Sequence, residues 1–66
     1  MQIIVNGEKK EVRKDLTVLE LLSELNLPTE RVAVEINKEV VRRQDWEFTK
    51  VKENDCIEIV HFVGGG

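Results

Sequence analysis

The sequence predicts an α+β domain in which a single amphipathic helix covers one face of one mixed β-sheet. The chain has 66 residues, which is the length of one small domain. The segment around residues 17–25 repeats its apolar residues with a helical period, whereas residues 1–6, 32–36 and 57–63 alternate as strands do. One helix can cover only one face of a sheet, so the opposite face is expected to stay uncovered.

The first segment predicts a β-hairpin. Residues 1–6 alternate between two faces, and Asn6-Gly7 is a typical two-residue hairpin turn because both positions accept positive φ. The return strand, residues 8–13, is highly charged, which suits a sheet edge because charges discourage pairing with other chains. We interpret its basic cluster as a solvated edge rather than a docking patch; the cluster consists of Lys9, Lys10, Arg13 and Lys14.

The helix is marked by signals at both of its ends. Thr17 and Glu20 have the spacing of a capping box, in which each side chain bonds to the other residue's backbone N–H. Asn26 and Pro28 are expected to end the helix after about two turns. One face carries the apolar residues Val18, Leu21, Leu22 and Leu25.

The second half of the chain predicts further strands at residues 32–36, 39–41 and 57–63. A tight turn at residues 44–46 is expected to place Trp46 at the edge of the core. The first and last strands are the most apolar, so we place them side by side and parallel in the middle of the sheet. This order of elements, with four to five strands in one sheet, defines the β-grasp, or ubiquitin-like, fold.

The strand alternation leaves apolar residues on the uncovered face. If Ile57 and Ile59 face the helix, then Val60 and Phe62 face away from it, as does Ile4 in the first strand. Small soluble proteins seldom leave such a patch without a partner, so we predict a docking surface formed by Ile4, Val60 and Phe62. Coverage by loops or closure of a dimer are the alternatives.

The chain ends in a glycine tail, and we divide it into a domain at residues 1–63 and a flexible tail at residues 64–66. Glycine has no side chain and allows another backbone to approach closely, so Gly64, Gly65 and Gly66 can form a thread that enters a narrow tunnel. Its tip would present the Gly66 carboxylate to a reagent. A carboxylate is a poor acyl donor, and adenylation would supply the activation that it needs.

The residue types exclude most other chemistry. Cys56 is the only cysteine, so neither an internal disulfide nor a zinc cluster can form, which fits a reducing compartment. We interpret Cys56 as a packing residue rather than a persulfide carrier, and His61 as a partly buried edge residue rather than a general base. No phosphate-binding loop or metal-ligand spacing occurs, so we predict no catalytic residue, no metal site and no enzyme activity.

The same composition limits location and partners. A net charge of −3 argues against nucleic-acid binding, and no stretch has the length of a membrane span or the pattern of a signal peptide. We therefore expect a cytoplasmic protein that is a monomer when free.

Several stretches, in this order, match one known family. They are Met-Gln-Ile at residues 1–3 with Asn6 at the hairpin, Thr17-Val18 and Leu21-Leu22 in the helix, residues 34–46, and Asp55 followed by residues 57–66. On these stretches essentially the whole chain resembles the ThiS-type sulfur carrier proteins of thiamin biosynthesis, which are β-grasp proteins ending in Gly-Gly. The third terminal glycine departs from that pattern and adds a reach of roughly 3.5 Å. Trp46 and Arg43 match the family too; we interpret Trp46 as a lid on the core and Arg43 as a surface or carbonyl-capping residue.

The resemblance implies a reaction cycle. A ThiF-type adenylyltransferase would activate the Gly66 carboxylate with ATP, and sulfur drawn from cysteine through a desulfurase would convert it to a thiocarboxylate. Thiazole synthase would then take the sulfur into the thiazole ring of thiamin. Gly64 and Gly65 would form the lead to the reactive end, and the carrier itself would bind no cofactor.

Three other functions remain open at this point. The same carrier chemistry could feed molybdopterin synthesis. Alternatively, Gly66 could end in an isopeptide bond to lysine, as in ubiquitin-like covalent modifiers. The third alternative is a plain interaction module in which the glycines have no chemical role.

Overall fold

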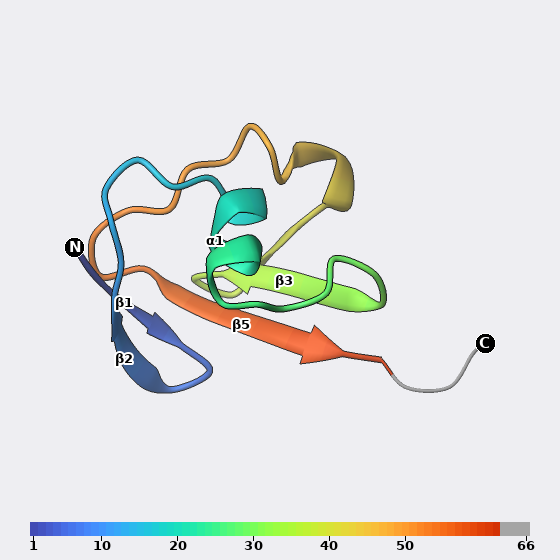
Figure 1. Cartoon of the computed structure of the whole chain (residues 1–66). Coiled ribbons are helices and arrows are strands. Elements are labelled where there is room, and N and C mark those ends of the chain that lie inside the picture. The colour runs from blue at the N-terminus through green and yellow to red at the C-terminus, as the bar shows by residue number, and fades with distance from the viewer. Residues whose placement is uncertain (63–66) are drawn as a thin grey trace.

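The computed structural model describes residues 1–62 and shows one helix lying on one face of a five-stranded sheet (Figure 1). Along the chain the elements are β1 (Gln2–Val5), β2 (Glu8–Glu11), α1 (Val18–Glu24), β3 (Val32–Ile36), β4 (Glu39–Val41), the short 3₁₀ helix η1 (Arg43–Asp45) and β5 (Cys56–His61). This is the β-grasp arrangement predicted from the sequence. The helix α1 has only seven residues, and no helix in residues 1–62 combines the length and the apolar character needed to cross a membrane.

The sheet order is β2-β1-β5-β3-β4, so the last strand lies in the centre. β1 and β5 are parallel, with Ile4 opposite Cys56, which confirms the predicted pairing of the first and last strands. On its other side β5 is antiparallel to β3, with Ile59 opposite Val34. β2 forms one edge of the sheet, as its charged sequence predicts.

The core lies between α1 and the sheet face that α1 covers. Val18, Leu21 and Leu22 are the buried residues of the helix. The sheet and the loops contribute the remaining buried residues of the core, which are Ile3, Val5, Leu16, Val32, Val34, Trp46, Val51 and Ile57. Ile59 is partly buried against this cluster, so both isoleucines of β5 face the helix as predicted.

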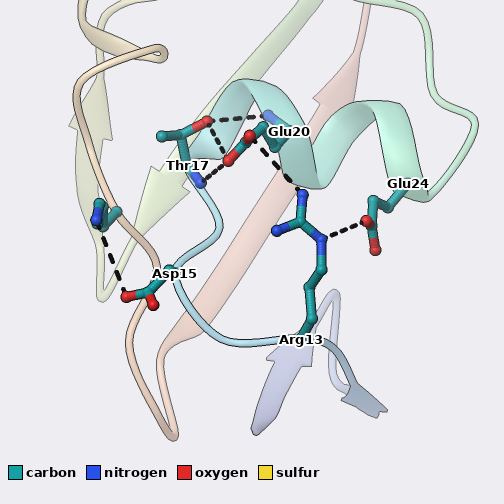
Figure 2. A network of polar contacts seen from close by, with 6 residues as sticks. Arg13, Asp15, Thr17, Glu20 and Glu24 are labelled. Atoms are coloured by element: carbon teal, nitrogen blue, oxygen red, sulfur yellow. Dashed lines mark hydrogen bonds and ion pairs between the residues drawn. The ribbon is translucent and has the colours of Figure 1, made fainter.

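The predicted capping box is present at the start of α1 (Figure 2). The Thr17 backbone N–H donates to the Glu20 carboxylate at 2.9 Å, and the Glu20 N–H donates to the Thr17 hydroxyl at 3.1 Å. The first of these bonds is the main reason that the pKa of Glu20 is lowered. Because a seven-residue helix is marginal by itself, these bonds and the packing of its apolar face hold it together.

Arg13 ties the loop before α1 to the helix (Figure 2). Its Nε lies 2.9 Å from the Glu24 carboxylate, and its guanidinium lies 3.7 Å from that of Glu20. The hydrogen bond to Glu24 is the main cause of a raised pKa for Arg13. β2 ends at Glu11 rather than at the predicted residue 13, although the Val12 N–H still donates to the Met1 carbonyl at 2.8 Å.

Trp46 and Arg43 have the structural roles predicted for them. Trp46 is buried at the end of the core, and its Nε1–H donates to the Val41 carbonyl at 3.0 Å. The Arg43 guanidinium stacks 4.7 Å from the centre of the indole ring and donates to the Thr29 carbonyl. Arg43 therefore caps a carbonyl while covering the tryptophan.

Candidate functional site

β5 carries the chain from the centre of the sheet toward its C-terminal end (Figure 1). The strand ends at His61, and the Phe62 N–H still donates to the Arg31 carbonyl at 2.8 Å. Val63, which we expected in the strand, lies outside the described residues. The sulfur-bearing role of Gly66, the lead formed by Gly64 and Gly65, and the domain boundary after residue 63 also lie there and stay predictions.

Val60 projects from the sheet face that α1 leaves uncovered, and Phe62 follows the end of β5. Their exposed fractions are 54% and 51%, whereas Ile57, on the covered face, is 1% exposed. Strand alternation therefore gave the correct face for Val60, and Phe62, which follows the end of β5, is exposed. Phe62 also lines a hollow of about 490 Å³, together with His61, Pro28, Glu30 and Arg31.

Ile4 lies on the same face but not beside Val60 and Phe62. The parallel register puts Ile4 opposite Cys56, the first residue of β5. Val60 is four residues further along the strand, a distance of roughly 13 Å. Glu58, which is exposed, lies between them. The apolar patch nearest the chain end therefore consists of Val60 and Phe62, and Ile4 belongs to the far end of that face.

The expectation that Cys56 is a packing residue is wrong, because its side chain is exposed. Cys56 precedes the buried Ile57, so strand alternation turns its side chain to the uncovered face. It lines a small hollow of about 220 Å³ with Ile4 and Lys38.

The expectation of a partly buried His61 is also wrong, since His61 is exposed. His61 is the last residue of β5 and lines an open hollow with Pro28 and Arg31. His61 and Cys56 lie at opposite ends of β5 and cannot act together as base and nucleophile. Among residues 1–62, no group of three possible ligands could hold a metal ion.

Asn6 is a residue near the site whose contact the sequence did not reveal. The sequence placed it only in the β1–β2 turn, where its φ is 49°. Its side chain also reaches across to β5 and bonds to Ile59, accepting from the N–H at 2.8 Å and donating to the carbonyl at 3.2 Å. No local pattern signals this contact, because the two residues are 53 positions apart.

Comparison with known proteins places this geometry in a family. The sequence model of the ThiS family matches residues 3–66. The sulfur carrier protein ThiS of Bacillus subtilis is 40% identical over 63 residues, which cover 94% of this chain and 96% of that protein. The crystal structure of the thiamine biosynthesis protein ThiS from Geobacter metallireducens has a TM-score of 0.89 and 42% identity, and the match covers both chains completely.

A longer relative is also similar. The thiazole synthase of Paramagnetospirillum magneticum is 39% identical over 66 residues, which are the whole of this chain but only 20% of that protein. The chain thus spans about a fifth of the length of that relative. Taken together, the family match and the full-length relatives show that the chain belongs to the ThiS family.

Proposed function

We propose that this protein is a sulfur carrier for thiamin biosynthesis and that the Gly66 carboxylate carries the sulfur as a thiocarboxylate. The observation that supports this most is the similarity over nearly the full length of both chains to a protein named sulfur carrier protein ThiS. The fold agrees with the role, because a central strand leads directly to the glycine end of the sequence. The exposed residues of β5 offer no nucleophile paired with a base, so the chemistry is assigned to partner enzymes.

The proposed reaction has two steps. An oxygen of the Gly66 carboxylate attacks the α-phosphorus of ATP, and pyrophosphate leaves. Hydrosulfide, released from the desulfurase persulfide by a thiol that is itself oxidised to a disulfide, then attacks the acyl carbon, so that a C–S bond forms as the C–O bond to AMP breaks. A ThiF-type adenylyltransferase provides the site for both steps, and the carrier itself holds no cofactor.

The docking surface for that enzyme is the uncovered face of β5. Val60 and Phe62 are both about half exposed and lie next to the end of the described chain. An enzyme that binds these side chains would hold the carrier in place while the glycine thread enters the active site of the enzyme. Ile4 extends the same face at the far end of the strand pair.

Thiazole synthase is the proposed recipient of the sulfur. In the relative named thiazole synthase, a segment similar to this whole chain is part of the same polypeptide. A carrier segment in the same polypeptide as its recipient does not have to find that recipient by diffusion. This arrangement favours thiamin over molybdopterin as the destination of the sulfur. We further expect the free carrier to be a cytoplasmic monomer.

The test uses the full-length protein, the cognate adenylyltransferase, ATP and a sulfur source. We expect the intact mass to rise by the difference between one sulfur and one oxygen atom, and only when ATP is present. Attachment of the chain to lysines of other proteins would support a covalent modifier instead. An unchanged mass with every adenylyltransferase of this type would leave only an interaction module.

A further inference from the structure

Two asparagines in the turns beside β5 bond to this strand in the same way, Asn37 at its first residue and Asn6 further along it. Asn6 occupies the β1–β2 turn with φ 49°, and Asn37 occupies the β3–β4 turn with φ 51°. Each uses its backbone N–H to bond a β5 carbonyl, Asn6 that of Ile57 at 2.8 Å and Asn37 that of Cys56 at 2.7 Å. Each then adds side-chain bonds, Asn6 to Ile59 and Asn37 to Cys56 and Asp55.

The bonds of Asn6 lie just beyond the end of β1, which is Val5. Strand pairing between β1 and β5 ends at Val5 opposite Ile57. The Asn6 side chain then takes the place of one more strand residue, because its Oδ1 accepts from the Ile59 N–H at 2.8 Å and its Nδ2 donates to the Ile59 carbonyl at 3.2 Å. In the part of the chain that the structure describes, these are the last bonds on the β1 side of β5 before the chain end.

The other side of β5 is held further along. His61 pairs with Val32 of β3, and the Phe62 N–H donates to the Arg31 carbonyl at 2.8 Å. Without the Asn6 bonds, the last residues of β5 would be fixed along one edge only, and the strand could pivot about β3. With them, β5 is bonded on both edges as far as Ile59, immediately before the exposed Val60.

We infer that Asn6 is a positioning residue for the reactive chain end, an inference that rests on the proposed function. The partner enzyme must bind Val60 and Phe62 and receive the glycine thread in the same complex. Asn6 fixes the direction of β5, so that the enzyme can bind Val60 and Phe62 and receive the glycine thread at the same time. Molecules in which β5 pivots cannot make both contacts and do not form the complex, so the apparent affinity falls in proportion to the fraction that is aligned.

The test compares Asn6→Gly with Asn37→Gly as its matched control. Glycine accepts positive φ, so both variants keep their turns and lose only the side-chain bonds. We expect Asn6→Gly to raise the KM of the carrier in ATP-dependent sulfur loading roughly five- to tenfold, with kcat unchanged at saturation. Asn37→Gly loosens the far end of β5 and should leave the KM within about twofold of the wild type.

Amide hydrogen exchange gives a second measurement that does not depend on the enzyme. The Ile59 N–H should exchange faster in Asn6→Gly, and the Cys56 N–H faster in Asn37→Gly, because each loses its side-chain acceptor. Asn6→Asp keeps the acceptor for the Ile59 N–H but loses the donor to its carbonyl, so its KM should lie between those of the wild type and Asn6→Gly. This variant also serves if Asn6→Gly does not fold.

Three results would overturn the inference. One is an unchanged KM in Asn6→Gly although the Ile59 amide exchanges faster. Another is an equal rise in KM for both glycine variants, which would mean that Asn6 only stabilises the sheet. The third is a wild-type protein that is not loaded at all, which refutes the proposed function and this role with it, whereas the first two results leave the proposed function intact.

Discussion

Replacing Phe62 by alanine tests whether the uncovered end of β5 is the docking surface. Phe62 is 51% exposed, so about half of its surface is free to be buried by a partner. A phenylalanine side chain buries about 200 Å² when it is fully enclosed, which leaves about 100 Å² for the interface. At about 25 cal/mol per Å², complete burial of that area is worth about 2.5 kcal/mol.

Alanine retains part of this contact, so the expected loss of binding free energy is about 2 kcal/mol, or about 30-fold in Kd. The stability of the free protein should change by about 1 kcal/mol or less, because the site is largely outside the core. The assay is calorimetric titration of each variant into the cognate adenylyltransferase, with thermal unfolding of the free variants measured alongside.

Phe48 supplies the matched control. It is 76% exposed and lines a different hollow with Val40 of the edge strand β4. Phe48→Ala should therefore bind the enzyme as the wild type does. Tight binding by Phe62→Ala together with weak binding by Phe48→Ala would refute the assignment and move the docking surface to the β4 edge.

Two further predictions concern the fold. Leu22 is fully buried, so Leu22→Ala should lower the free energy of unfolding by about 3 kcal/mol in urea titration. The same change at Leu19, which is 39% exposed on the same helix, should cost less than half as much, and equal losses would contradict the helix orientation. Because the Thr17 N–H lowers the pKa of Glu20, the ionised carboxylate stabilises the fold at neutral pH, and this contribution is lost as the pH falls through the lowered pKa. The wild type should therefore lose its stability advantage over Glu20→Gln as the pH falls from neutral through the lowered pKa of Glu20; an advantage that does not change with pH would count against the capping role of the carboxylate.

The features that the sequence predicted correctly depend on neighbouring residues or on regular alternation. The capping box at Thr17 and the turn at Asn6-Gly7 are local signals, and the burial of Ile57 against the exposure of Val60 follows from the period of a strand. The features that it missed depend on elements far apart in the chain. The distance between Ile4 and Val60 is set by the register of β1 against β5, and His61 is exposed in a hollow that it lines with residues of the α1–β3 connection. The bonds of Asn6 to Ile59 appear only once that register is known.

The most direct test of the account is whether the terminal carboxylate is the group that takes up sulfur. Two altered chains, one lacking Gly66 and one ending in a Gly66 amide, should be compared with the wild type by intact mass after incubation with the adenylyltransferase, ATP and a sulfur source. The amide has no free carboxylate to be adenylated, and the shortened chain presents its carboxylate one residue too early. We expect the wild type to gain one sulfur in place of one oxygen, the amide to gain none, and the shortened chain to react much more slowly. Sulfur uptake by the amide at the wild-type rate would contradict the account.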